Sequence, residues 1–161
     1  MDMLLFFKGV TADLRLQGRD LLADDSLYTA VVVSLFTDAR ARSSDELPPE
    51  FEAEDLRGFW GDGLGEESIG SRLWLLAREK DTARVRARAE QYAREALAWL
   101  VRDGLAGKVE VTADHPESGV CRLTVRLTYP TDRTREPHTD RWNFKIDLRE
   151  GGSYALEPAN A

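Results

Sequence analysis

A change of hydrophobic period near residue 105 constrains the fold of this chain more than any other feature. From about residue 83 to residue 103, one apolar set recurs at steps of four and three, which is the spacing of one face of an α-helix. From residue 109 onward, apolar and polar residues alternate with the period of a half-buried strand. The chain therefore predicts a long amphipathic helix followed by strands. The helical set is Val85, Ala89, Tyr92, Ala96 and Trp99.

Three segments show the strand pattern, at 109–113, 121–129 and 141–149. A turn at 115–119 separates the first two, and the polar residues 130–140 separate the last two. Each segment has one apolar face, which predicts an antiparallel sheet packed on helices. The second and third strands have charged outer faces, and one edge of the sheet is expected to stay open at these strands. The predicted fold class is α+β, with two to three helices packed against a small antiparallel β-sheet.

Two further helices are expected in the first half of the chain. Leu27 to about Arg42 has apolar residues at helical spacing, although the run Val31–Val33 leaves a buried strand open as an alternative. A shorter helix is expected from about Ser68 to Glu79, with Asp81 or Thr82 capping the long helix that follows. The apolar stretch Met3–Phe7 is interpreted as an N-terminal strand or docking segment rather than a signal peptide.

Residues 44–65 are predicted to form a long loop rich in glycine, tryptophan and acidic residues. Between residues 44 and 68, nine acidic residues face a single basic one, Arg57. Two interpretations of this charge remain open: a solvated acidic loop, or a surface that docks on an oppositely charged protein. Trp60, between glycines and charges, is expected to be at least partly interfacial, whereas Trp74 and Trp99 are expected to be core residues.

Composition limits the classes of function. At 161 residues the chain fits one domain, expected to span 1–150, with 151–161 as a flexible tail. The net charge of −7 disfavours nucleic acid as a partner, and no apolar run is long enough to predict a membrane span. The single cysteine, Cys121, lies on an apolar strand face and is expected to be a core residue.

The sequence contains no pattern that predicts a metal ion or a cofactor. His115 and His138 each lie in a turn beside proline, with no second ligand at metal spacing, and no phosphate-binding or nucleophile motif occurs. One catalytic alternative stays open: two of the carboxylates of Asp62, Glu66 and Glu67 could serve a peptidoglycan-active, lysozyme-like glycosidase, with Trp60 as a sugar platform.

Six short motifs of the chain form a recognisable set: Leu27–Val31, Ser34–Asp38, Arg57–Asp62, Gly70–Leu76, Arg78–Lys80 and Ala96–Leu100. Together they resemble the Mu-like phage baseplate wedge family, over about residues 12–149. Phe59 stands where that family usually has tryptophan, so an aromatic ring is retained.

The resemblance implies a non-enzymatic, structural role in the tail of a contractile phage or tailocin. This family is similar to the short wedge proteins of other contractile phages and of type VI secretion systems. By that similarity, several copies per baseplate would lock the wedge core around the central hub and spike. They would also start the tail sheath by β-strand augmentation. The implied location is the virion tail baseplate, reached from the host cytoplasm during assembly.

Two sets of residues are the predicted contacts. The first, for wedge and hub partners, is Arg57, Phe59, Trp60, Asp62, Ser71, Arg72, Arg78 and Lys80. The second, on the strands expected to meet the sheath, is Arg122, Thr124, Arg126, Asn143, Lys145 and Asp147.

Overall fold

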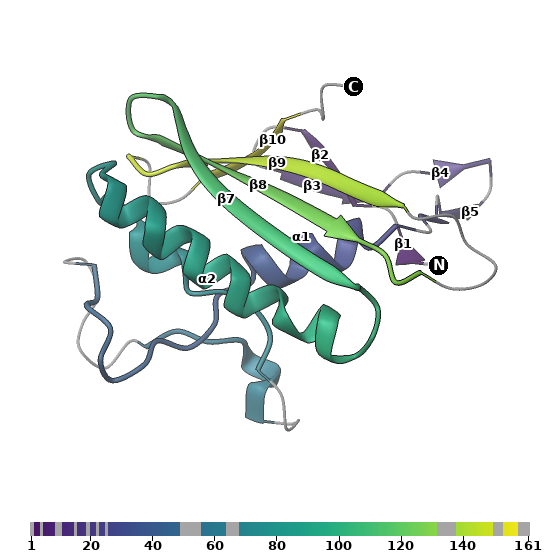
Figure 1. Ribbon diagram of the computed structural model, residues 1–161, viewed down its shortest axis with the longest axis horizontal. Helices are drawn as coiled ribbons and strands as arrows, with labels where there is room; N and C mark the ends of the chain where they lie inside the picture. Colours follow the sequence, from purple (N-terminus) through teal and green to yellow (C-terminus); the bar gives the residue numbers. More distant parts are fainter. Residues whose placement is uncertain are drawn as a thin grey trace.

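A four-stranded antiparallel sheet covered on one face by two α-helices forms the body of the protein (Figure 1). The computed structural model describes residues 2–3, 5–8, 11–14, 16–18, 20–21, 23–24, 26–48, 56–63, 68–131, 138–149 and 153–157. The α+β fold class predicted from the sequence is confirmed. The loop predicted at 44–65 lies partly outside the described residues.

The sheet contains the three predicted strands and one more, in the order β10-β9-β8-β7. Every neighbouring pair is antiparallel, and Leu123 lies opposite Ala113 on one side and Phe144 on the other. The turn predicted at 115–119 is too long: β7 continues to Glu117 with a register shift after Asp114. The hairpin turns only at Gly119, whose φ of +78° is in the region that favours glycine. The strands are β7 (Lys108–Glu117), β8 (Val120–Thr128), β9 (Thr139–Asp147) and β10 (Ser153–Glu157).

Strand β10 corrects two expectations. The flexible tail expected from residue 151 contains a strand instead, because Ser153–Glu157 completes the backbone ladder of β9. The open edge expected on 119–129 or 141–149 is absent, since β8 is central and β10 covers β9. A five-residue strand is too short to show a clear period, and only its partner strand defines it.

Helix α2 (Ala83–Arg102) confirms the long helix, and it packs against β7. The Thr82 side chain caps it by accepting a hydrogen bond from the backbone N–H of Val85 at 3.2 Å. Gly104, with φ of +74°, follows its C-terminal end as expected.

Helix α1 (Tyr28–Phe36) is shorter than the predicted helix, which extended to about Arg42. The chain leaves the helix at Thr37, and Asp38 forms a bridge with Ser71 instead of continuing the turn. The side chain of Phe36 contacts the ring of Phe144 at 5.3 Å between centroids, so α1 packs against β9. No helix among the described residues is long and apolar enough to cross a membrane.

The helix expected from Ser68 to Glu79 is reduced to one 3₁₀ turn, η2 (Leu73–Leu76). Positive φ angles at Gly70 and Arg78, of +107° and +62°, stop the helix on both sides. All four residues of η2 are buried, so the apolar run that suggested a helix is a short segment of the core. The expectation for this segment was wrong because burial on all sides resembles a helix in sequence.

Short antiparallel pairs precede α1. The predicted N-terminal strand is present as β2 (Leu5–Lys8), which pairs with β3 (Thr11–Leu14) and lies beside β10. The remaining pairs are β1 (Asp2–Met3) with β6 (Ala23–Asp24), and β4 (Leu16–Gln17) with β5 (Asp20–Leu21).

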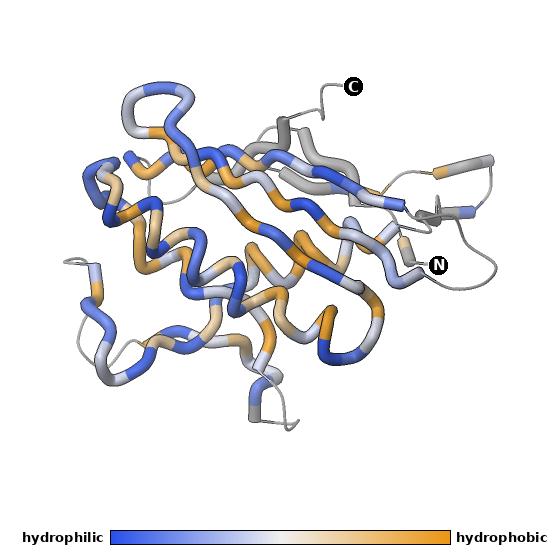
Figure 2. Tube along the Cα trace, in the orientation of Figure 1, coloured by the Kyte–Doolittle hydropathy of each residue, from blue (hydrophilic) through white to orange (hydrophobic). Residues whose placement is uncertain are grey.

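The core lies between the sheet and the two helices. Figure 2 shows apolar and polar residues alternating along β8 and apolar residues recurring along α2. Trp74 is buried and Trp99 is partly buried against the same cluster, as predicted. Cys121 is also buried, and this burial raises the pKa of its thiol to about 11. These residues are structural parts of the core.

Candidate partner-binding surface

The segment around Gly70 fixes the position of the predicted contact region against the end of α1. The Ser71 N–H donates to the carbonyl of Thr37, the Ala39 N–H donates to the carbonyl of Ser71, and both distances are 2.9 Å. A Cβ atom on Gly70 would lie 2.4 Å from the Thr37 oxygen. Only glycine allows this close approach at φ of +107°, so the segment has one defined conformation.

The 3₁₀ turn η1 (Trp60–Gly63) is tied to this segment by Asp62. Its carboxylate accepts hydrogen bonds from the Ile69 N–H at 3.1 Å and from the Ser68 hydroxyl at 3.4 Å. Trp60 is 81% exposed, and its ring contacts that of Phe59 at 5.4 Å between centroids. A large aromatic side chain is therefore presented to solvent on a closed turn, as the sequence predicted.

Arg57 connects the aromatic turn to the core. Its guanidinium donates to the Asp38 carboxylate at 2.6 Å and lies over the Trp74 ring, 4.9 Å from the centroid. The Trp74 indole N–H in turn donates to the Ala39 carbonyl at 2.8 Å. Arg57 has a φ of +48°, a strained value for a residue with a side chain. Arg57 thus holds the turn in place while its side chain stays partly exposed.

Arg72 and Ser71 are buried residues at the inner wall of a groove, and their polar groups are bonded within the protein. The Arg72 side chain is 8% exposed, and its guanidinium donates to Asp45 and to Glu95. The Ser71 hydroxyl donates to the Leu35 carbonyl inside the protein. Their predicted role as direct contacts stays a prediction, and in this structure their polar groups support the neighbouring segments instead.

Asp45 and Glu95 were not singled out from the sequence. Burial alone would raise the pKa of Asp45, but the hydrogen bonds and charge of Arg72, with the Arg42 N–H, outweigh it and lower that pKa. Burial would also raise the pKa of Glu95, but the hydrogen bonds from Gln91 and Arg72 and the charge of Arg72 outweigh it and lower that pKa. Nothing in the local sequence marks Asp45 among nine loop acids, because its partner lies on another segment.

A groove of about 940 Å³ opens between α1, α2 and the segment around Gly70. Two exposed apolar side chains, Val33 and Ile69, contribute to its lining, together with the partly buried Trp99. Arg40 and Arg102 lie among its polar lining residues. The Ile69 N–H is bound by Asp62, so one end of the groove is tied to the turn that carries Trp60.

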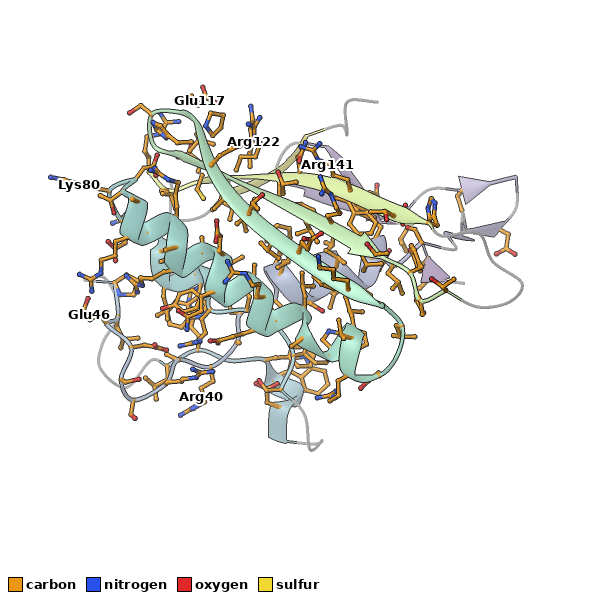
Figure 3. The ribbon with its side chains drawn as sticks, viewed as in Figure 1. Arg40, Glu46, Lys80, Glu117, Arg122 and Arg141 are labelled. Carbon is orange, nitrogen blue, oxygen red and sulfur yellow. The ribbon has the colours of Figure 1, made fainter. Side chains whose placement is uncertain are left out.

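Arg78 and Lys80 lie at a different place, beside the N-terminal end of α2. Both side chains are exposed, and they line a second groove of about 600 Å³ together with Glu46. The Arg78 N–H donates to the Leu148 carbonyl at 2.7 Å, which holds the strained backbone of Arg78. Figure 3 shows the Lys80 side chain pointing away from the body of the protein. The predicted set is therefore split into two patches.

The six predicted sheath-contact residues share the outer face of the sheet, opposite the helices. Most of them are linked to neighbours: Arg122 pairs with Asp114 at 2.7 Å, and the Thr124 hydroxyl donates to the Asn143 side chain at 2.9 Å. Lys145 lies 3.6 Å from Glu117. With their partners on β7, these residues form a network of polar contacts across β7, β8 and β9. They lie on the face of the sheet rather than at an edge.

The carboxylates of the catalytic alternative are not assembled into a site within the described residues. Asp62 holds the turn closed, as above, and Glu66 and Glu67 lie outside the described part of the chain. The described residues also contain no group of three or more His, Cys, Asp or Glu side chains placed to hold a metal ion.

Comparisons with known proteins show the family of the chain. Residues 27–134 match the family described as phage protein GP46. The chain is 44% identical to the baseplate protein gp46 of Escherichia phage Mu over 129 residues, which cover 80% of this chain and 88% of that protein. It is 37% identical to the Mu-like prophage FluMu protein gp46 of Haemophilus influenzae over 146 residues, or 90% and 98% of the two chains. The matched region contains both helices, the exposed turn and the grooves, and the chain belongs to the phage protein GP46 family.

Proposed function

We propose that this protein is a non-enzymatic structural component of the baseplate of a contractile phage tail or tailocin. The proposal rests on its relationship to a protein of phage Mu that is named as a baseplate protein. The described residues support the proposal because Arg57, Asp62 and Arg72 use their side chains to hold surface segments in defined positions. Asp62, which could have served in catalysis, is one of these fixing groups.

Contact with wedge and hub neighbours is assigned to the surface around Trp60. The observation that carries this assignment is an 81% exposed tryptophan on a turn that Asp62 and Arg57 hold rigidly. Exposed aromatic side chains on fixed scaffolds lose little conformational entropy on binding, so they are common energetic centres of interfaces. The apolar groove lined by Ile69 extends the same surface. Arg78 and Lys80 would form a second, charged contact.

Sheath initiation by strand addition is assigned to the β7 edge of the sheet. β7 is an end strand of the four, whereas β2 lies beside the opposite end strand, β10. The Glu90 carboxylate accepts a hydrogen bond from the Ala113 N–H at 2.8 Å, so this N–H points away from β8. Because N–H groups alternate in direction along a strand, those of Val109 and Val111 point to the same edge. An added strand would pair there with β7, and the predicted sheath-contact residues of β8 and β9 would lie further along the same sheet, beyond β7.

The test is electron microscopy of particles from the parent element after deletion of this gene. The expected result is tail tubes without baseplate and sheath, restored by the wild-type gene and not by Trp60→Ala. Leu105→Ala is the matched control, since Leu105 is an exposed apolar residue on the α2–β7 connection. Intact sheathed tails in the deletion strain would overturn the proposal. Hydrolysis of purified peptidoglycan by the isolated protein would point to the glycosidase instead.

A further inference from the structure

Two arginines face each other across neighbouring strands on the outer face of the sheet. Arg126 of β8 and Arg141 of β9 are direct partners in the antiparallel register. Both are exposed, and Figure 3 shows Arg141 on the side of the sheet opposite α1 and α2. Side chains at directly opposed positions have Cβ atoms about 4.5–5.5 Å apart, so the two arginine side chains start from adjacent positions on this face.

Neither arginine forms a hydrogen bond or close ion pair with a carboxylate within the described part of the chain. Glu110 lies opposite Arg126 on β7 and is attracted by its charge, but the ammonium group that contacts this carboxylate, at 2.8 Å, is that of Lys108. By contrast, Arg122, two positions along the same face of β8, is paired with Asp114 through two hydrogen bonds at 2.9 and 2.7 Å. Among the described residues, the neighbouring cations Lys108 and Arg122 are therefore hydrogen-bonded to carboxylates, whereas this central pair is not.

Like charges at directly opposed positions destabilise a sheet. The repulsion between these two arginines is therefore notable in a chain whose net charge is −7 and which has an excess of acidic residues. Two adjacent guanidinium groups instead suit an incoming pair of carboxylates, which each can bind through two parallel hydrogen bonds. We infer that this face docks an acidic segment of a neighbouring baseplate protein, with its carboxylates bridging Arg126 and Arg141. The inference rests on the proposed baseplate role and adds the chemistry of the partner.

A protein segment fits this face better than a nucleic acid does. Glu110, Asp114 and Asp147 lie on the same face around the arginine pair. A phosphate backbone carries a charge at every step and would meet these acids as well as the arginines. A segment with two discrete carboxylates meets only the two arginines, while Thr124 and Asn143 supply polar contacts beside them.

The decisive experiment places an amine at this position in assembled tails. Arg126→Lys and Arg141→Lys keep the positive charge, and carbodiimide then joins each new amine to any carboxylate that touches it. Mass spectrometry of tails purified from the parent element should show a cross-link from residue 126 or 141 to an Asp or Glu of another protein. The wild-type protein, which retains Lys145 on this face, and Arg84→Lys on α2 are the controls, and neither should give this cross-link.

Charge reversal supplies the second arm. Arg126→Glu/Arg141→Glu should lower the amount of this protein in purified tails by at least about tenfold, because like charges would then meet across the interface. Arg84→Glu should not. Arg126→Gln/Arg141→Gln should have a Tm no lower than that of the wild type, which shows that the fold survives.

Other outcomes would overturn the inference. Normal incorporation of the charge-reversed protein without a new cross-link would do so while leaving the baseplate role intact. Absence of the wild-type protein from tails would instead remove the proposed function itself. If inorganic phosphate raises the Tm of the wild type but not of the double Gln variant, the pair is a small-anion site. Binding of single-stranded oligothymidylate that is lost in the double Gln variant would identify a nucleic-acid site.

Discussion

The Arg72 guanidinium donates to both carboxylate oxygens of Asp45, at 2.7 and 2.9 Å, with both side chains almost fully buried. Its other terminal nitrogen donates to Glu95 on α2, and its Cζ atom lies over the Tyr92 ring, 4.4 Å from the ring centroid. One side chain thus joins the acidic loop, the segment after Gly70 and the long helix. This junction fixes the segment to which Asp62 ties the turn of Trp60, and its own polar groups are paired within the protein.

Arg72→Gln is expected to lower the free energy of unfolding by about 3–5 kcal/mol, because it leaves the buried Asp45 carboxylate without its counter-charge. Urea denaturation followed by circular dichroism measures the change. Arg94→Gln is the matched control: Arg94 pairs with Glu90 on the exposed side of α2, and its loss should cost at most about 0.5 kcal/mol. Equal effects of the two variants would show that the Arg72 junction contributes no more than a surface pair.

The same junction predicts how stability depends on pH. The pKa values of Asp45 and Glu95 are lowered in the folded protein, so the unfolded chain binds more protons at low pH. The free energy of unfolding should therefore be constant well above the ordinary carboxyl values of 3.8 and 4.5 and fall as the pH drops through and below them. Denaturation between pH 7 and pH 3 tests this, and Arg72→Gln should have a shallower slope than the wild type.

Gly70→Ala should destabilise the protein by about 2–4 kcal/mol, since it adds a Cβ against the Thr37 carbonyl at a positive φ. Gly104→Ala is the control: its φ is also positive, at +74°, but no atom lies within 4 Å of the added Cβ. Its cost should stay near 1 kcal/mol. Thermal unfolding of the two variants would contradict the assignment if Gly104→Ala were the less stable one.

Trp60 and Trp74 should differ strongly in how much their substitution lowers the free energy of unfolding. Trp60→Ala should change the free energy of unfolding by less than about 0.5 kcal/mol, because the side chain is exposed. Trp74→Ala should cost about 3–5 kcal/mol, because it leaves a cavity and an unpaired Ala39 carbonyl. Chemical denaturation distinguishes them. A large loss for Trp60→Ala would mean that its effect on assembly reflects folding rather than contact.

Cys121 should be protected from thiol reagents in the folded state. It is buried, and burial raises its pKa to about 11, so little thiolate forms at pH 8. A colourimetric disulfide reagent should react with it slowly in buffer and rapidly in denaturing urea. Fast reaction of the native protein would contradict its placement in the core.

The sequence by itself determined the elements whose signal is local. The period of Val85, Ala89 and Tyr92 was sufficient for α2, and alternation was sufficient for β7, β8 and β9, because each residue's face follows from its own neighbours in the chain. The exposure of Trp60 and the burial of Trp74 also followed from their immediate surroundings of glycines and charges or of leucines.

Tertiary structure alone decided the features that depend on pairing between distant segments. Strand β10 exists because β9 offers it a backbone ladder, and η2 is a single turn because Gly70 must approach Thr37. Arg72 was expected at a surface, but Asp45 and Glu95 neutralise it in the interior. Local composition fixes which residues can be buried, whereas the partner that makes burial of a charge favourable is set only by how the segments meet.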